Sequence, residues 1–259
     1  MNRFQASEQF RYTYLNKTYE KLVSGKIGSI NPPFFTARIP IIRMFSKRKL
    51  QVDIQFGNIG PIRSSLFIRT CVEYDERVRL LIHWLTNKFQ ESEILKNRFF
   101  SRYHINVLVV HFLQAIPYPV LPDIINLSPW LSKKNDWNNA VKVLTRQGSL
   151  YVPNCNEVPN EQSVGGLAVQ LIDYYSQIDF RKFAIDTRGH VFERTDNDPL
   201  FFKISDEYFE QPTCNVMEAP RLLSKLFSEL KSKVKSGNYE DVFNYHVQIK
   251  KAKSSESIA

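Results

Sequence analysis

Residues 49–58 read KLQVDIQFGN, and this stretch decides how the start of the chain folds. Apolar and polar side chains alternate along it, which predicts a strand with one buried face. Val52, Ile54 and Phe56 share the apolar face, and Asp53 lies in the middle of the polar face. Asp53 is therefore either an ordinary solvated residue or one member of a metal-binding carboxylate set.

A second strand-like run, ARIPIIRMF, covers residues 37–45. The short basic turn SKRK joins the two runs, so the sequence predicts a hairpin. Pro40 marks the first strand as an edge strand or as the site of a bulge, because proline has no N–H to donate. The basic residues of this hairpin are Arg43, Lys47, Arg48 and Lys49. They either contact RNA phosphates or belong to a solvated turn.

Helical periodicity dominates the rest of the chain. The expected helices are residues 11–26, two consecutive helices within 64–90, and residues 99–116, 164–178 and 218–236. We expect Asp75 to cap the second helix of the pair and Ser163 to cap the helix at residues 164–178. The pattern of residues 183–194 predicts a second hairpin, and the loop-rich, polar segment 117–162 is expected to be an exposed connection. This order indicates an α+β protein with its sheet at the start.

The composition is that of a folded protein, since 43% of the 259 residues are hydrophobic and 13% are aromatic. Cys71, Cys155 and Cys214 stand far apart, so neither a disulfide framework nor a zinc site is predicted. The apolar runs of this sequence are shorter than those of signal peptides and membrane spans. We therefore expect a soluble intracellular protein without membrane contact, cytoplasmic rather than nuclear. The net charge of +9 favours a polyanionic partner such as RNA.

Several blocks of the sequence follow one another in an informative order. They are ARIPIIRMF, LQVDIQFGN, SSLFIRTCVEYDERVRLLIHWL, FSRYHINVLVVHFLQ, PVLP and SVGGLAVQLIDYYSQIDF. Their order and spacing resemble the terminal uridylyltransferases and noncanonical poly(A) polymerases, which are DNA polymerase β-like nucleotidyltransferases. The resemblance implies a truncated palm (1–60), a mainly helical central PAP-associated domain (61–240) and a polar basic tail (241–259). It also implies a cleft for the RNA 3′ end.

By this resemblance Asp53 is a catalytic residue and a metal ligand, because the family carries its third catalytic aspartate on a V-D-I strand. In the family three carboxylates hold two Mg²⁺ ions, one at the terminal ribose hydroxyl and one at the triphosphate. The other two form an Asp-x-Asp pair on an earlier strand, whereas residues 1–52 contain no aspartate here. Asp196 and Asp198 have that spacing, but they follow a hairpin and read as turn residues. An active form would use Mg²⁺ or Mn²⁺ with a nucleoside triphosphate.

The resemblance also implies a nucleotide-binding pocket in the central domain. Ser64 and Ser65 stand where the family presents an Asn followed by Ser or Thr to the ribose. Ser101, Arg102 and Tyr103 correspond to the family's Ser-Ser-Tyr block, in which the tyrosine stacks on a base. The alternative reading of Tyr103 is a core aromatic at the start of a buried helix.

Other positions depart from the family pattern. Ile82 and Thr86 replace two lysines that contact phosphates in the family, and Lys88 would compensate in part. Asp206 and Asn215 have counterparts in a block whose histidine selects uracil in the family. No histidine occurs in this block of the chain, so the base preference is not predicted. His104 and His111 share one helix face, where we expect core or surface histidines rather than metal ligands.

Three interpretations follow from these observations. The first is an RNA 3′-terminal nucleotidyltransferase for poly(A) or poly(U) addition, catalytically impaired in this chain and active in a longer form or with another chain. The second is a non-catalytic relative that binds RNA or a partner, as a scaffold or regulatory subunit in RNA tailing or silencing. The third is an incomplete gene model. The altered positions in the central domain favour a degenerate enzyme. A two-stranded palm would expose a sheet edge, and either another protein chain or residues 1–36 would cover it.

Overall fold

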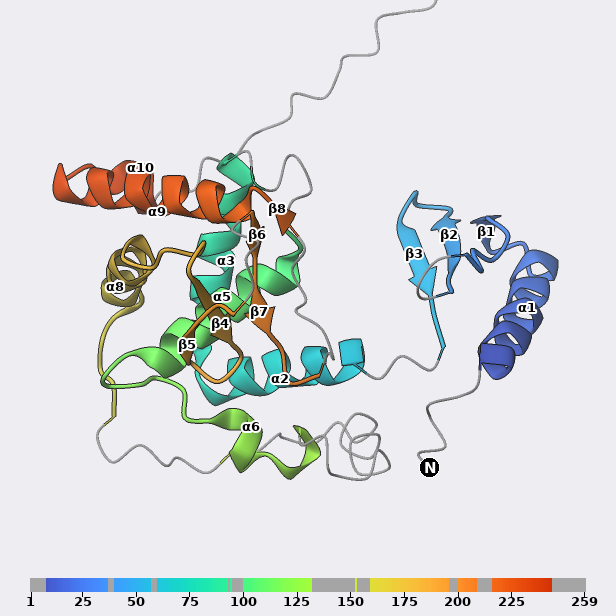
Figure 1. Cartoon of the computed structure of the whole chain (residues 1–259). Coiled ribbons are helices and arrows are strands. Elements are labelled where there is room, and N and C mark those ends of the chain that lie inside the picture. Colours follow the sequence, from blue (N-terminus) through green and yellow to red (C-terminus); the bar gives the residue numbers. More distant parts are fainter. Residues whose placement is uncertain are drawn as a thin grey trace, which may run out of the picture. The chain divides into compact units, whose positions relative to one another are not determined.

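The computed structural model describes residues 8–36, 40–56, 60–92, 94, 100–131, 152, 159–195, 200–208 and 216–243. The chain divides into two compact units, residues 1–65 and 66–259. Helices and strands occur in both units, which confirms the α+β prediction (Figure 1).

The first unit contains one long helix and a three-stranded antiparallel sheet. Its elements are α1 (Glu8–Ser24), β1 (Gly28–Ile30), β2 (Ile42–Ser46) and β3 (Gln51–Ile54). The strand order is β1-β2-β3. Arg43 lies opposite Asp53, and Phe45 lies opposite Ser29 on one side and Gln51 on the other. The predicted hairpin is confirmed as β2 and β3, and β1 is a further strand whose three residues carry no strand pattern of their own.

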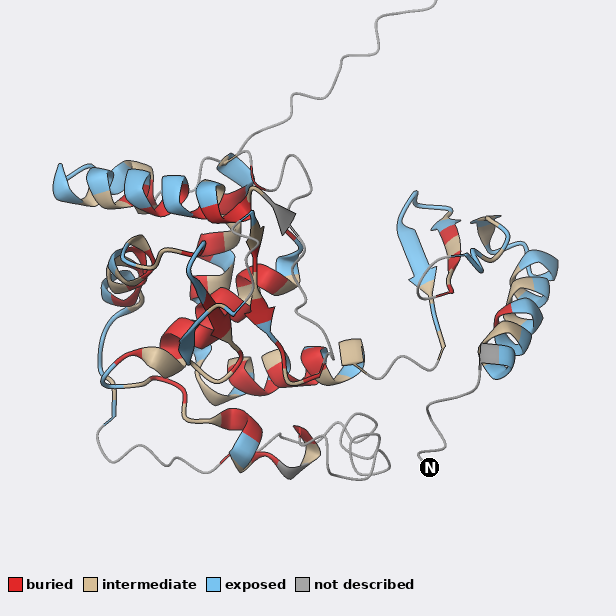
Figure 2. Ribbon diagram, in the orientation of Figure 1, coloured by how far each residue is buried: buried red, intermediate tan, exposed pale blue. Residues whose placement is uncertain are grey.

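The two faces of this sheet differ in burial. Ile42 and Met44 are buried on one face, whereas Phe45 on the other face is 38% exposed. Val52 shares the face of Met44 but is 41% exposed, so the predicted burial is wrong for Val52, whereas Ile54 and Phe56 are partly buried. The helix α1 packs against β1, and its Tyr14 contacts Phe56 just beyond β3. Figure 2 shows the decrease in burial from β2 to β3.

The second unit is mainly helical. Its helices are α2 (Gly60–Tyr74, of which residues 60–65 belong to the first unit), α3 (Glu76–Glu91), α5 (Arg102–Ala115), α6 (Ile124–Leu127), the 3₁₀ helix η1 (Pro129–Leu131), α8 (Val164–Ser176), α9 (Ala219–Lys235) and α10 (Tyr239–Phe243). Its strands are β4 (Phe183–Asp186), β5 (Val191–Glu193), β6 (Phe201–Phe202), β7 (Ile204–Ser205) and β8 (Val216–Met217). They form two small sheets, β5-β4-β7 and β6-β8.

Local capping explains where two of these helices begin. The side chain of Asp75 accepts a hydrogen bond from the backbone N–H of Arg77 at 2.9 Å, at the start of α3. The hydroxyl of Ser163 accepts one from Gly166 N–H at 3.2 Å, at the start of α8. Both caps were predicted, and both are confirmed because an Asp or Ser oxygen satisfies a backbone donor that the first helical turn leaves unpaired.

The segment 117–162 is more ordered at its start than the sequence predicts. Val120 and Leu121 are buried, and the backbone N–H groups of both donate to the Leu113 carbonyl. Asp123 then caps α6 by accepting from Asn126 N–H. The prediction of an exposed connection is therefore wrong for this part, because apolar side chains spaced along a polar stretch hold it against α5. The residues around SKKNDWNN lie outside the described part of the chain.

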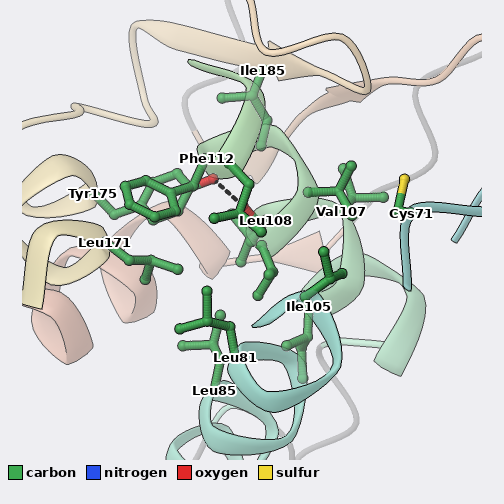
Figure 3. Close-up of a cluster of buried hydrophobic side chains, with 14 of the residues drawn as sticks. Cys71, Leu81, Leu85, Ile105, Val107, Leu108, Phe112, Leu171, Tyr175 and Ile185 are labelled. Atoms are coloured by element: carbon green, nitrogen blue, oxygen red, sulfur yellow. Dashed lines mark hydrogen bonds between the residues drawn. The ribbon is translucent and has the colours of Figure 1, made fainter. Parts of the chain in front are cut away.

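The core of the second unit surrounds α5, as Figure 3 shows. Leu81 and Leu85 of α3 and Leu171 of α8 are fully buried around it. The hydroxyl of Tyr175, which is also fully buried, donates to the backbone carbonyl of Leu108 at 2.6 Å. This bond satisfies the only polar atom of the Tyr175 side chain inside an apolar environment.

The turn between β4 and β5 packs closely against the end of α5. Gly189 has φ +88°, and a Cβ at this position would lie 2.9 Å from the Cβ of Gln114. Glycine is therefore required both by conformation and by space. The predicted hairpin over residues 183–194 is confirmed by the antiparallel pairing of β4 and β5. Among the described helices, none is both long enough and apolar enough to cross a bilayer.

Candidate functional site

Asp53 forms a two-point ion pair with its neighbour on β2. The Nε of Arg43 donates to Oδ1 and its Nη2 donates to Oδ2, both at 2.8 Å. Each side chain is 37% exposed, so the pair faces solvent. The hydrogen bonds from Arg43 lower the pKa of Asp53 below its ordinary value of 3.8. The carboxylate is therefore ionised near neutral pH, and a guanidinium already contacts both of its oxygens.

The donors that two-metal chemistry needs do not accompany Asp53. Among the described residues, no group of three or more His, Cys, Asp or Glu side chains is placed to hold a metal ion. Asp196 and Asp198 lie outside the described part of the chain. One ion-paired carboxylate does not fit a pair of divalent cations, because each cation needs several oxygen ligands. The described residues therefore do not form the metal centre that the resemblance implies.

The N-terminal turn of α5 carries three of the predicted nucleotide-binding residues. The hydroxyl of Ser101 accepts from His104 N–H at 3.4 Å, and Nδ1 of His104 accepts from Ser101 N–H at 3.2 Å. Ser101 thus acts in a reciprocal cap of the helix. Arg102 is exposed beside it, and Tyr103 is half-buried and packs against the core. Arg102 is therefore the group of this turn that remains open to an anionic ligand.

Two predicted residues that lie far apart in the sequence meet at this turn. The hydroxyl of Tyr103 donates to Oδ2 of Asp206, and Oδ1 of Asp206 accepts from the backbone N–H of Tyr208 at 2.8 Å. Asp206 is only 5% exposed. Tyr103 is thus an aromatic residue at the edge of the core, and its hydroxyl also bonds to a predicted site residue. Asn215 lies outside the described residues.

Ser64 and Ser65 occupy the second turn of α2 and point in different directions. Ser64 is 3% exposed, and its hydroxyl has no hydrogen-bond partner among the described residues. Ser65 is exposed, and its hydroxyl donates to the carbonyl of Pro61 at 2.8 Å. The two hydroxyls do not face a common point on the helix surface, because neighbouring residues of a helix lie about 100° apart.

Lys88 does not supply the phosphate contact that the sequence suggested. Its side chain is 3% exposed, and its ammonium bonds to Glu91 Oε2 and to the backbone carbonyl of Asp241, both at 3.0 Å. The indole N–H of Trp84 donates to the next carbonyl, that of Val242, at 2.9 Å. Lys88 and Trp84 thus hold α10 against α3. The expectation that Lys88 compensates for the two missing lysines is wrong, because its charge is used inside the protein.

Arg188 organises the surroundings of Asp206, although no sequence pattern pointed to this residue. One nitrogen of its guanidinium donates to Asp123 Oδ2 at 3.0 Å and to Asn126 Oδ1 at 2.9 Å. The other donates to Glu207 Oε2 at 3.2 Å. The β4–β5 turn is thereby tied to α6 and to the residue that follows Asp206. These three partners are 65, 62 and 19 positions away in the sequence, so no local motif predicts the cluster.

The two predicted histidines are structural. His104 belongs to the cap of α5, and His111 is fully buried in the same helix. Nδ1 of His111 lies 2.9 Å from the Asp186 carbonyl and Nε2 lies 3.0 Å from the Tyr174 hydroxyl. Because a carbonyl only accepts, Nδ1 carries the proton and Nε2 accepts from Tyr174. Burial lowers the pKa of His111 from 6.5 to about 4.

The chain has relatives of known description, although no protein-family model matches it. Over 160 residues it is 33% identical to the poly(A) RNA polymerase gld-2 homolog A of Drosophila melanogaster. This match covers 59% of this chain and 11% of that protein. Over 181 residues it is 26% identical to the human poly(A) RNA polymerase GLD2, and this match covers 68% of this chain and 36% of that protein. The matched part of the chain therefore spans little more than a third of these relatives at most.

Solved structures show the same fold. One is the structure of a GLD-2/RNP-8 complex, with a TM-score of 0.69 and 20% identity over 92% of this chain and 75% of that one. Another is Cid1 in complex with its short product ApU, with a TM-score of 0.67 and 19% identity over 90% of this chain and 77% of that one. In sequence the chain is thus similar to poly(A) RNA polymerases, and in fold it is similar to the solved structures of GLD-2 and Cid1.

Proposed function

We propose that this chain is an RNA 3′-terminal nucleotidyltransferase relative that binds RNA but does not transfer nucleotides by itself. The observation that carries this proposal is the Arg43–Asp53 pair. The carboxylate that corresponds to a catalytic aspartate of the family is bound at both oxygens by a guanidinium. The described residues offer no further carboxylates to complete a metal centre around it.

The relatives support the RNA part of the proposal. Two of them are named as poly(A) RNA polymerases, and the solved neighbours include Cid1 with the dinucleotide product ApU and mtPAP with UTP. For this chain, Tyr103 and Arg102 at the start of α5 would contact the base and the phosphates. Mg²⁺ or Mn²⁺ with a nucleoside triphosphate would be used only when the missing carboxylates come from elsewhere.

The test is extension of a labelled single-stranded RNA primer by the purified chain with each nucleoside triphosphate and either Mg²⁺ or Mn²⁺. The matched control is Asp53→Ala, which removes the one recognised carboxylate and leaves the preparation otherwise the same. We expect no extension by either protein and an unchanged gel shift of the primer. Extension that Asp53→Ala abolishes would show that the chain completes its own metal site, and the proposal would be wrong.

A second candidate function is that of a subunit whose sheet another protein chain completes. The observation in its favour is the open edge at β3, where Leu50 is 62% exposed and Val52 is 41% exposed. A sheet edge with apolar side chains is a typical site for strand addition by a partner. One solved neighbour, the GLD-2/RNP-8 complex, is an assembly of two proteins. The test is primer extension by a tagged chain that is purified from its native cells together with its partners. Activity that the recombinant chain lacks, and that Asp53→Ala abolishes, would support this candidate.

A further inference from the structure

The positive charge of the protein is concentrated in its smaller unit. Residues 1–65 contain eleven Lys and Arg residues but only three Asp and Glu residues, a balance of +8 out of the formal +9. The remaining three quarters of the chain are almost neutral. A strongly basic unit in an otherwise nearly neutral chain is the charge pattern expected where a protein contacts nucleic acid phosphates.

Three of these basic residues follow one another in the β2–β3 turn. Lys47, Arg48 and Lys49 are consecutive and exposed, and no ion pair to a carboxylate involves them within the described residues. The turn itself is well defined, because Lys49 N–H donates to the Ser46 carbonyl at 2.8 Å and Ser46 N–H donates to the Leu50 carbonyl at 2.9 Å. Three cations are therefore presented together on a fixed hairpin end.

An aromatic side chain lies directly beside the turn, on the sheet face opposite to the buried residues Ile42 and Met44. Phe45 is 38% exposed on the open face of the sheet, between Ser29 of β1 and Gln51 of β3. Arg43 and Asp53 form the next row on this face and neutralise each other. Its cross-strand neighbours on this face are polar, so no apolar side chain of the paired strands covers it there. Part of the ring is buried, but the 38% that remains exposed leaves area for a base to stack on.

We propose that the open face of β1-β2-β3 is a single-stranded RNA platform, in which Phe45 stacks on one base and Lys47, Arg48 and Lys49 contact the adjacent phosphates. Antiparallel sheets that bind single-stranded RNA use this combination, with aromatic rings on the open face and cations at its border. The proposal rests on the RNA binding proposed above and assigns it to a surface. It predicts a preference for unpaired over double-stranded RNA, because a base inside a duplex offers no free face to Phe45.

The test is fluorescence anisotropy of the full chain with a short labelled single-stranded RNA of mixed sequence, at several salt concentrations. Phe45→Ser and Phe45→Leu remove the ring, and Phe45→Tyr keeps it. The matched control is Phe192→Ser, since Phe192 on β5 is 41% exposed. We expect the two ringless variants to bind about tenfold more weakly or worse, and Phe45→Tyr and Phe192→Ser to bind as the unmodified chain does.

The charge is tested by reversing Lys47, Arg48 and Lys49 to Glu together. The control reverses three exposed lysines of the other unit, Lys182, Lys225 and Lys235. Each phosphate contact to a single strand contributes about 0.7 to the slope of log affinity against log salt, so the turn variant should lower that slope by about 2. The control variant should change it clearly less. Circular dichroism and urea unfolding show that each variant is folded.

The outcomes separate this inference from the proposed function. If the unmodified chain binds no RNA, both are wrong. If it binds RNA but the Phe45 and turn variants bind as their controls do, the platform is wrong and the proposed function stands. Equal binding of a duplex of the same length would also overturn the platform, because stacking on Phe45 would then contribute nothing.

Discussion

Arg43 and Asp53 face each other across β2 and β3, and the guanidinium of the first donates to both carboxylate oxygens of the second at 2.8 Å. The pair decides the electrostatics at Asp53, the residue for which the sequence predicts the role of a metal ligand. A carboxylate with a lowered pKa adds stability above its ordinary pKa of 3.8, and this contribution disappears as the pH falls through the lower value in the folded protein.

Arg43→Gln should therefore raise the pKa of Asp53 towards 3.8, because the charged hydrogen-bond donors are lost. The measurement is an NMR titration of carboxyl carbons labelled in aspartate. The control is Arg69→Gln, which removes a partner of Glu73 and leaves Asp53 untouched. An Asp53 pKa that does not move in Arg43→Gln would show that the ion pair does not persist in solution.

The buried imidazole of His111 should make the protein sensitive to acid. Its pKa is about 4 in the folded protein and 6.5 in an exposed histidine, so the unfolded chain takes up a proton between these values that the folded chain does not. Stability therefore falls as the pH is lowered from 6.5 to 4, by up to about 3 kcal/mol from this group alone. Urea unfolding at several pH values measures the effect.

His111→Gln should flatten this acid dependence while it lowers stability at neutral pH, because the bonds to Asp186 and Tyr174 change. His83→Gln, at an exposed histidine, should leave the acid dependence as it is. The same slope in both variants would mean that another group causes the loss.

Leu80 and Leu81 form a matched pair in α3, since the first is 38% exposed and the second is fully buried. Leu81→Ala leaves a cavity beside α5 and should lower the free energy of unfolding by about 2–5 kcal/mol. Leu80→Ala should change it by less than about 0.5 kcal/mol. Similar unfolding midpoints for the two variants would contradict the packing of α3.

The ammonium of Lys88 and the indole of Trp84 should hold α10 in place. Lys88→Met leaves the Asp241 carbonyl without this donor, and we expect a loss of about 1–3 kcal/mol. Hydrogen exchange at the amides of Tyr239–Phe243 should accelerate at the same time. Lys225→Met is the control, because its contact with Glu229 is exposed and long at 3.9 Å. Unchanged exchange in α10 would show that Lys88 does not anchor it.

Tyr103→Phe should destabilise the second unit, because Asp206 is buried and loses a hydroxyl donor. The expected loss is about 1–3 kcal/mol. Tyr118→Phe is a suitable control, since Tyr118 is 66% exposed. If both variants unfold at the same urea concentration as the unmodified chain, the contact between Tyr103 and Asp206 contributes nothing to stability.

Much of the fold follows from local patterns in the sequence. The break between α2 and α3 and the caps at Asp75 and Ser163 depend on residues within one helical turn, and each was predictable for that reason. The hairpin of β2 and β3 follows from alternation and a short turn. Conversely, β1 has three residues and owes its existence to pairing with β2, which no local pattern encodes.

The candidate site was less predictable, because its contacts are set by register and tertiary packing. The sequence placed Asp53 on a strand but did not indicate Arg43 as its partner, since the pairing depends on the register of the hairpin. Lys88 has the spacing of an exposed phosphate ligand, yet α10 covers it. Arg188 meets Asp123 and Glu207 only after three separate segments come together.

The basic turn next to the open edge of β3 has a consequence for how the chain behaves in concentrated solution. When two copies approach edge to edge, each carries three positive charges next to its edge, and the repulsion between the two basic turns disfavours the joining of two sheets. Salt weakens that repulsion, since charges are screened over about 10 Å at 0.1 M ionic strength. The protein should therefore stay dispersed at low ionic strength and become turbid as salt or a polyanion neutralises the turn, so its colloidal stability depends on three residues outside the core.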